Sequence, residues 1–200
     1  MIAIIDYGMG NLRSVTNAFA RLGASIALTR DKGVIAEAGA IVLPGVGAFG
    51  KCMENLKGFD LLDVLKEQIV KGKPYLGICL GLQMLFESSE EAPGVGGLGL
   101  VKGQVKRFRN DVKVPHMGWN QVEQMKASQV FRGIGQGENF YFVHSFYPEP
   151  GEDVIATRTD YGSPFASSIE RENIFACQFH PEKSQKVGLR LLQNFINKCA

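Results

Sequence analysis

Residues 75–83 read YLGICLGLQ, and this stretch predicts a buried strand that runs directly into a helix. Its first four residues are apolar, Cys79 stands at the turn, and helical spacing continues over residues 80–87. Gly77 and Gly81 flank Cys79 two positions away on either side, where a larger side chain would collide with the neighbouring strand or helix. The stretch therefore indicates one strand–turn–helix unit of a parallel sheet, with a cysteine at its sharpest turn.

The rest of the first half repeats this alternation of short apolar runs and helical stripes. The expected strands cover residues 2–5, 25–28, 40–43 and 75–78, and the expected helices begin at Asn11, Leu61 and Leu80. After residue 88 the pattern changes to alternating β-branched and aromatic residues, which predict mostly antiparallel strands over 101–108, 121–125, 140–146, 154–157, 165–169 and 174–179, before a last helix at 184–198. We therefore expect an α/β fold, with a central, mostly parallel sheet extended by antiparallel strands and with residues 1–200 as a single domain.

The composition excludes several classes of function. The formal net charge of +2 is too balanced for a protein that tracks nucleic-acid phosphates. No apolar run approaches the roughly 18–20 residues that span a bilayer, and the MIAII start lacks the basic region and cleavage site of a secretory signal. None of the four cysteines forms a CxxC pair, which argues against a zinc site. We expect a cytoplasmic protein that binds neither membranes nor nucleic acid.

Cys79 has the setting of a catalytic nucleophile. A helix N-terminus favours the reactive thiolate, and the backbone N–H of Leu80 faces the position where an oxyanion would form. His180 is the candidate base because it follows an apolar strand, and Glu182, two residues on, can orient its imidazole. A buried structural cysteine and a turn histidine are the alternative interpretation, but the three residues together favour a Cys-His-Glu triad.

A second oxyanion donor is expected from the loop PGVG at residues 44–47. This loop follows a predicted strand next to the one that ends at Cys79, and its glycines let backbone N–H groups approach a ligand. Gly47 or Val46 could supply the donor. An ordinary turn remains the alternative, whereas a phosphate loop would end in Gly-Lys-Ser or Gly-Lys-Thr, which is absent here.

Three motifs carry a family resemblance: PGVG at 44–47, GICLGLQ at 77–83 and QFHPE at 178–182. They resemble the signatures of class I, triad-type glutamine amidotransferases. The resemblance implies a flavodoxin-like three-layer sandwich that hydrolyses the side-chain amide of glutamine. The residues it implies are Cys79, His180 and Glu182 for catalysis, Gly47 and Leu80 for the oxyanion hole, and Gln83 for binding glutamine.

Two further stretches, VPHMGWN at 114–120 and YFVHSFY at 141–147, resemble the glutaminase subunits of imidazole glycerol phosphate synthase. So do DYGMGN at 6–11 and the Lys183-Ser184 pair after the triad. In that group the second stretch lies near bound glutamine, although Phe146 stands where a tyrosine is more usual. The resemblance therefore adds His144, Ser145 and Phe146 to the glutamine site, and Asn11, Met117, Trp119, Tyr141 and Lys183 to a partner interface.

The resemblance also implies a division of labour between two chains. No second active site is apparent here, so the acceptor chemistry is expected on a barrel-shaped cyclase subunit in a heterodimer. Its products would be imidazole glycerol phosphate and an aminoimidazole carboxamide ribotide, in histidine biosynthesis. The glutaminase chemistry requires neither a metal nor an organic cofactor.

Several alternatives stay open from the sequence. They are a glutaminase subunit serving pyridoxal phosphate or anthranilate synthesis, a cysteine peptidase or γ-glutamyl hydrolase on the same scaffold, and a non-enzymatic binding module. Without the resemblance, Met117 and Trp119 would be interpreted as core residues. The basic cluster Lys102, Lys106, Arg107 and Arg109 is interpreted as a solvated strand face, with a docking or phosphate role as the weaker alternative.

Overall fold

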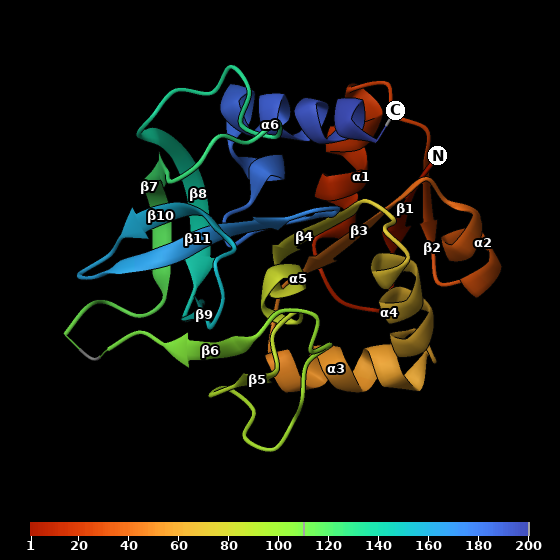
Figure 1. Cartoon of the computed structure of the whole chain (residues 1–200), viewed down its shortest axis with the longest axis horizontal. Coiled ribbons are helices and arrows are strands. Elements are labelled where there is room, and N and C mark those ends of the chain that lie inside the picture. The colour runs from red at the N-terminus through yellow and green to blue at the C-terminus, as the bar shows by residue number, and fades with distance from the viewer. Residues whose placement is uncertain (110, 200) are drawn as a thin grey trace.

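The computed structural model describes residues 1–109 and 111–199, and its helices cover both faces of one large sheet (Figure 1). The strands are β1 (Ile2–Ile5), β2 (Ile26–Thr29), β3 (Ala40–Gly45), β4 (Tyr75–Cys79), β5 (Ser88–Ser89), β6 (Gly103–Arg107), β7 (His116–Gln124), β8 (Glu138–His144), β9 (Phe146–Pro150), β10 (Ile155–Asp160), β11 (Pro164–Arg171) and β12 (Ile174–Cys177). The helices are α1 (Leu12–Arg21), α2 (Lys32–Glu37), α3 (Phe49–Gly58), α4 (Leu62–Val70), α5 (Leu80–Gln83), the 3-10 turn η1 (Pro181–Lys183) and α6 (Gln185–Lys198).

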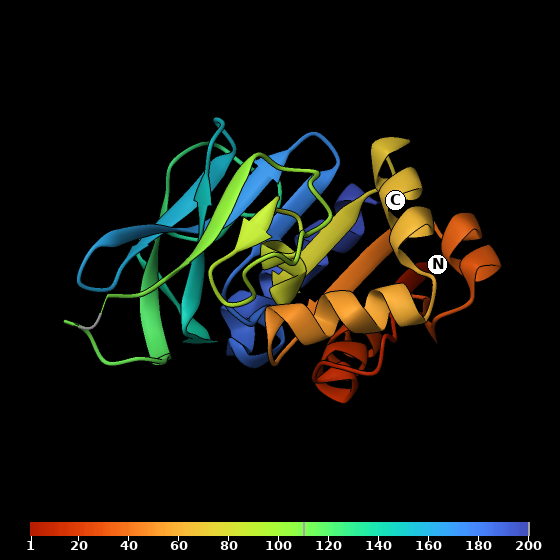
Figure 2. The ribbon, with the colours of Figure 1, turned by 90° about the horizontal axis from the view of Figure 1, so that it is seen from below.

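Within the described ranges the large sheet has nine strands, in the order β2-β1-β3-β4-β12-β11-β10-β7-β8. The first five are parallel neighbours, and each later pair is antiparallel. A smaller sheet, β5-β6-β9, lies beside this antiparallel part, as Figure 2 shows from below. The expected α/β fold, with a parallel centre and an antiparallel extension, is confirmed.

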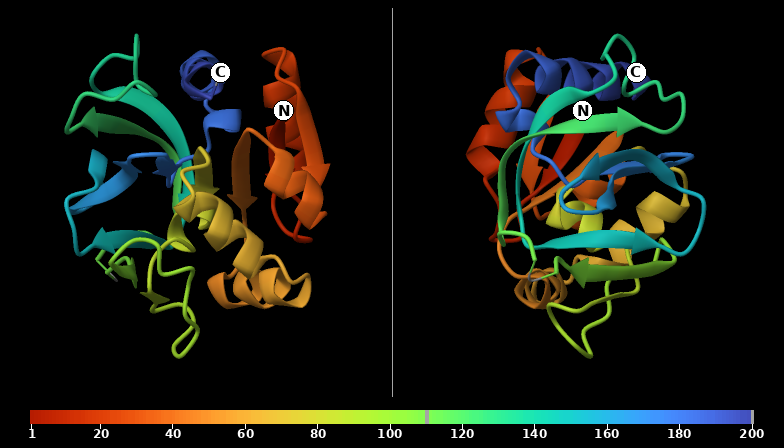
Figure 3. Two further views of the ribbon diagram at one scale, coloured as in Figure 1. Left: turned by 45° about the vertical axis from the view of Figure 1, so that its right-hand side comes forward. Right: turned by 90° about the vertical axis from the view of Figure 1, so that its left-hand side faces the viewer.

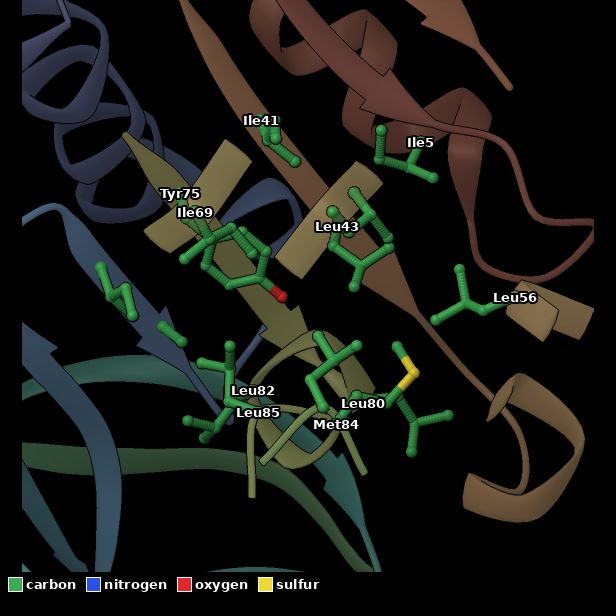
Figure 4. Packing of buried hydrophobic residues seen from close by; sticks show 14 of the residues in the cluster. Ile5, Ile41, Leu43, Leu56, Ile69, Tyr75, Leu80, Leu82, Met84 and Leu85 are labelled. Carbon is green, nitrogen blue, oxygen red and sulfur yellow. The ribbon is translucent and has the colours of Figure 1, made fainter. Parts of the chain in front are cut away.

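The inner parallel strands β1, β3, β4 and β12 are buried on both faces, as a sheet between two helical layers requires, whereas the edge strand β2 is partly exposed. Because side chains alternate along a strand, Ile41 and Leu43 of β3 pack with the layer that contains α3, α4 and α5, as Figure 4 shows. Val42 faces the opposite side and packs with α1 and α6. Figure 3 shows these two helices together on that face.

The helix expected over residues 80–87 is shorter than its apolar pattern predicted. It ends at Gln83, because the backbone carbonyls that would continue it accept bonds from the following loop. Leu98 donates to the carbonyl of Met84 at 2.7 Å, and Leu100 donates to that of Leu85 at 2.9 Å. The side chains of Met84 and Leu85 are therefore buried without a second helical turn.

The carboxyl ends of β3, β4 and β12 lie side by side in the sheet. The chain leaves β3 and β4 toward one helical layer and leaves β12 toward the other. Gly45 at the end of β3 pairs with Cys79 at the end of β4, and Ile78 pairs with Cys177 at the end of β12. The carboxyl ends of neighbouring parallel strands open at one edge, which is where ligands bind in sheets of this kind. The segments that follow β3, β4 and β12 therefore converge at a single place.

Candidate active site

Cys79 lies on a sharp turn with φ +54° and ψ −103°, a backbone conformation that residues other than glycine rarely adopt. The turn requires glycines on both sides. A Cβ on Gly81 would lie 1.8 Å from the carbonyl oxygen of Leu43, and one on Gly77 would lie 2.5 Å from the carbonyl oxygen of Gly81. Tyr75 donates its hydroxyl to that same Gly81 carbonyl at 2.7 Å. Such strain is stored where the surrounding packing fixes a functional residue.

His180 and Glu182 form a buried pair immediately after β12. His180 Nδ1 lies 2.8 Å from Glu182 Oε1, and both side chains are at most 2% exposed. The backbone N–H of His180 donates to the carbonyl of Tyr141 at 2.9 Å, which ties the turn to β8. In the described part of the chain, His180 Nε2 is buried without a hydrogen-bond partner. This nitrogen is therefore free to exchange a proton with a reacting group.

The electrostatics couple His180 to Cys79. Burial alone would lower the pKa of His180, but the neighbouring Cys79 and the Glu182 carboxylate raise it more strongly, and the net result is a pKa well above the ordinary 6.5. An imidazolium beside the sulfur favours the thiolate, which is the nucleophilic form of a cysteine. The Glu182 carboxylate bonds Nδ1 of His180, which fixes the orientation of the ring, and it stabilises the charged form of the imidazole.

Two buried glutamine amides connect the nucleophile to the pocket wall. Gln178 donates from Nε2 to Cys79 Sγ at 3.5 Å, and its Oε1 accepts from Gln83 Nε2 at 3.0 Å. Gln83 also donates to the backbone carbonyl of Phe146 at 3.0 Å. Gln83 was predicted in the site from the sequence, whereas Gln178 had no predicted role, although it belongs to the QFHPE motif.

A pocket of about 230 Å³ opens beside Cys79. Among the residues that line it are the predicted Val46, Gly47, Leu80, Gln83, His144, Ser145 and Phe146. Gly47 has φ +111°, so its loop uses a conformation natural to glycine. Glu91 was not predicted from the sequence, but it also lines the pocket and accepts the N–H of Phe49 at 2.8 Å. No local motif marks this acid inside a glycine-rich loop, so only the fold reveals it.

Three of the five predicted interface residues, Met117, Trp119 and Tyr141, lie on β7 and β8, next to the residues of β8 that line this pocket. Met117 and Trp119 on β7 are 63% and 48% exposed, so their interpretation as core residues is wrong. Trp119 packs edge-on against Tyr141, and Lys183 Nζ lies 5.7 Å from the centre of the Tyr141 ring. Asn11 instead caps α1, accepting the N–H of Ser14 at 3.4 Å.

The remaining sequence features have structural explanations. Burial raises the pKa of the Cys52, Cys177 and Cys199 thiols, as expected of structural cysteines. Lys106 of the basic cluster pairs with Glu149 at 2.6 Å on the face of β6, which agrees with a solvated strand face. Across residues 1–109 and 111–199 there is no cluster of three or more metal-binding side chains, and no helix is both long and apolar enough to cross a membrane.

Comparison with known proteins agrees with this geometry. The family model described as glutamine amidotransferase class-I matches residues 3–199, and the chain therefore belongs to that family. The HisH subunit of imidazole glycerol phosphate synthase from Methanothermobacter thermautotrophicus is 54% identical over 98% of each chain. The HisH subunit from Aquifex aeolicus is 52% identical over 98% of this chain and 96% of its own. Within its family, the chain thus belongs with the glutaminase subunits of imidazole glycerol phosphate synthase.

Solved structures support the fold independently of close sequence similarity. A crystal structure described as a glutamine amidotransferase aligns with a TM-score of 0.79 at 20% identity, covering 100% of this chain and 99% of the other. PurLQS from Thermotoga maritima aligns with a TM-score of 0.74 at 18% identity, covering 100% and 98% of the two chains. At such identities the alignments establish the shared fold alone.

Proposed function

We propose that this chain, acting as one domain over residues 1–200, releases ammonia from glutamine through Cys79, His180 and Glu182. We propose further that the ammonia is consumed by a barrel-shaped cyclase subunit in a heterodimer. The observation that carries the proposal is the convergence of the Cys79 turn, the His180–Glu182 pair and the Gly45–Gly47 loop at neighbouring strand ends.

The pocket offers acceptor groups for the amide and ammonium hydrogens of glutamine. Gln83 uses its Nε2 hydrogens on Phe146 and Gln178, which leaves its Oε1 as an acceptor toward the pocket. Glu91 brings a carboxylate to the same lining and can balance an ammonium group. His144, Ser145 and Phe146 close the opposite wall. Glutamine would enter with its side-chain amide toward Cys79.

The chemistry divides into two steps. The Cys79 thiolate attacks the amide carbon, and the developing oxyanion accepts hydrogen bonds from the backbone N–H groups of Leu80 and Gly47. His180 gives its proton to the departing nitrogen, so ammonia leaves and a thioester remains. A water molecule, deprotonated by His180, then attacks the thioester, glutamate is released, and the Cys79 thiolate and the protonated His180 are restored. Every proton in this sequence passes through Nε2 of His180.

The partner would dock on the side of the pocket formed by β7 and β8. Met117 and Trp119 present a large exposed apolar surface there, and Lys183 and Tyr141 adjoin it. Asn11 lies at the start of α1, which packs near η1. The acceptor products would be imidazole glycerol phosphate and an aminoimidazole carboxamide ribotide of histidine biosynthesis. The cytoplasm suits a chain whose cysteines are all unpaired.

A glutamine-analogue alkylator followed by peptide mass mapping tests the assignment. We expect label on Cys79, because it combines a pocket, a strained turn and a neighbouring imidazole. Cys52, Cys177 and Cys199 are internal controls, since burial raises the pKa of each thiol and lowers its reactivity. Equal labelling of any control cysteine would remove the basis for choosing Cys79, and excess free glutamine should protect Cys79 in a competition experiment.

A further inference from the structure

His116 and His144 form a buried pair that the triad does not use. They face each other across β7 and β8, with His116 Nδ1 2.9 Å from His144 Nε2. The two residues are 3% and 6% exposed. Two imidazoles that share one hydrogen bond need one donor and one acceptor, so their tautomers are coupled.

Asn120 determines which nitrogen of His116 carries the proton. Its Oδ1 accepts the backbone N–H of Gln121 at 2.8 Å, and its Nδ2 donates to the carbonyl of Asp160 at 2.8 Å. These two bonds fix the amide orientation, because a backbone N–H only donates and a carbonyl only accepts. The same Nδ2 lies 3.2 Å from His116 Nε2, which must therefore be the acceptor.

The direction of every later bond follows from this assignment. With Nε2 accepting, His116 carries its proton on Nδ1 and donates to His144 Nε2. His144 must then carry its own proton on Nδ1, which lies 2.8 Å from the carbonyl oxygen of Phe146. Asn120, His116 and His144 thus form a hydrogen-bond relay in which each residue donates to the next and His144 donates to the Phe146 carbonyl.

The relay ends on an atom of the glutaminase site. The Phe146 carbonyl also accepts from Gln83, and Gln83 donates in turn to Gln178, which donates to Cys79 Sγ. If His144 carried its proton on Nε2 instead, its Nδ1 would face the Phe146 carbonyl with two acceptors opposed. The carbonyl would move, and Gln83 would lose one of the two partners that aim its oxygen into the pocket.

The surroundings keep both imidazoles neutral. His116 stacks between the rings of Phe142 and Tyr161, and Phe108 and Phe165 pack against both histidines. Burial lowers the pKa of His116 to about 4, and burial, helped by charge on His116 and His180, lowers the pKa of His144 to about 3. The titratable groups that face the pair are Tyr161 and His180. The relay therefore holds its polarity throughout the neutral range.

We propose that Asn120 and His116 are positioning residues of the glutaminase site, which set the tautomer of His144 and thereby hold the Phe146 carbonyl and the Gln83 side chain in place. This inference rests on the proposed function, since it assigns these residues to the hydrolysis of glutamine at Cys79. It predicts that reversing the relay at Asn120, on the strand that carries Trp119, disturbs chemistry at Cys79.

Asn120→Asp is the discriminating variant. A carboxylate accepts but does not donate, so His116 must carry a proton on Nε2. The stacked aromatic rings disfavour an imidazolium there, so His116 gives up its Nδ1 proton and the relay reverses, and imidazole ¹⁵N shifts distinguish this neutral tautomer from a charged ring. Gln121→Glu is the matched control, because it makes the same amide-to-acid change at the adjacent exposed position. His116→Phe removes the relay while keeping an aromatic ring between Phe142 and Tyr161.

The measurements use the complex with its cyclase subunit. The chain is labelled with ¹⁵N-histidine and assembled with the unlabelled partner, so imidazole ¹⁵N shifts report tautomers of this chain alone. We expect His116 and His144 to carry their protons on Nδ1 in the wild type. In Asn120→Asp we expect both protons to lie on Nε2. Glutamine-dependent kcat/KM should fall at least about tenfold in Asn120→Asp and His116→Phe, as expected for one buried hydrogen bond. Ammonia-dependent synthesis should match that of Gln121→Glu.

Two results would overturn the inference. One is an Nε2–H tautomer of His144 in the wild-type complex, a measurement that needs no variant to fold. The other is a glutamine-dependent kcat/KM in Asn120→Asp equal to that of Gln121→Glu. Failure of the proposed function is distinguishable, because the wild-type complex would then release no glutamate from glutamine.

Discussion

At the scale of single residues, the site depends on how Glu182 holds His180. The carboxylate lies 2.8 Å from Nδ1, and its charge helps to raise the pKa of the imidazole. A neutral amide at this position would keep the size of the side chain, but it would not stabilise the imidazolium or enforce the tautomer with Nε2 toward Cys79.

Glu182→Gln should therefore lower kcat for glutamine hydrolysis by roughly 10²–10⁴-fold. Binding of glutamine should change little, because Glu182 does not line the pocket beside Cys79. Steady-state glutamate release by the complex measures kcat and KM separately, and ammonia-dependent synthesis is the control for folding and assembly. An unchanged kcat would show that His180 needs no anionic partner.

The buried histidine pair makes folding stability depend on pH in a defined direction. Burial lowers the pKa of His116 to about 4 and that of His144 to about 3, whereas an unfolded chain has an ordinary value near 6.5. The unfolded chain therefore binds more protons at mildly acidic pH. The contribution of these groups to stability is complete above about pH 6.5 and is lost as the pH falls toward 4.

Urea unfolding of the wild type and His116→Phe, between pH 7.5 and pH 5, measures this dependence. The variant should lose less unfolding free energy over that interval, because one of the two titrating groups is gone. His180 acts in the opposite sense: its pKa is raised, so its contribution is present at acidic pH and is lost only as the pH rises above neutral. Parallel pH profiles of the two proteins would rule out His116 as a source of acid sensitivity.

At the scale of elements, helix α6 approaches the catalytic turn at a glycine. A Cβ on Gly188 would lie 1.9 Å from the carbonyl oxygen of Pro181, between the triad residues His180 and Glu182. The Pro181 carbonyl is part of the backbone and cannot rotate away as the end of a flexible side chain can. A side chain at position 188 therefore requires α6 or η1 to move. The position of the turn that carries the triad is thus set by packing of the last helix.

Gly188→Ala should destabilise the protein by about 1–3 kcal/mol and should lower kcat as well. Gly58→Ala is a matched control, since it lies at the end of α3, and a Cβ there meets nothing within 4 Å. That control should be neutral or slightly stabilising. Thermal unfolding measures the stability of the two variants, and glutamate release measures their kcat. Equal stability and equal kcat in Gly188→Ala and Gly58→Ala would show that the contact between Gly188 and Pro181 does not position the turn.

The elements differ in how far local sequence determines them. The strand at Ile2–Ile5 and the start of β4 at Tyr75 were predicted because a buried parallel strand is a continuous apolar run. The start of β7 at His116, five residues before the predicted strand, was not, because that segment is held by pairing with β8. Helices α2 and α3 were also missed. Local patterns define buried runs, whereas pairing partners come from the tertiary fold.

The same distinction explains the site. The motif around Cys79 and the His180–Glu182 spacing carry their chemistry within short stretches, so the sequence was enough to propose a triad. Gln178 and Glu91 join the site only because distant strands and loops meet there. Glu91, an acid in a loop, has no local signature, whereas Gln178 lies in the QFHPE motif and only its contact with Cys79 needed the structure.

At the scale of the whole molecule, the loop Gly45–Gly47 connects the oxyanion site to control by the partner. Glycine allows a peptide in this loop to flip at small cost, and loss of one oxyanion donor typically slows catalysis by on the order of 10²–10³-fold. A partner that stabilises the competent loop would shift its population and activate the enzyme. The isolated chain would then waste little glutamine.

We therefore expect the isolated chain to bind glutamine but to hydrolyse it slowly, with the cyclase and its acceptor accelerating release by roughly the oxyanion-donor factor or more. Glutamate release is measured for the chain alone, with cyclase, and with cyclase plus acceptor. Full activity of the isolated chain would refute control by the loop, although the triad assignment would stand.

In the proposed function, Cys79 produces the ammonia that a synthase on another chain uses. The most direct test compares the wild-type complex with Cys79→Ala, supplied with either glutamine or ammonium salt. We predict that the variant loses glutamine-dependent synthesis and retains ammonia-dependent synthesis at the wild-type rate, because the acceptor site lies elsewhere. Glutamine-dependent synthesis that survives the Cys79→Ala substitution would show that Cys79 is not the source of the ammonia.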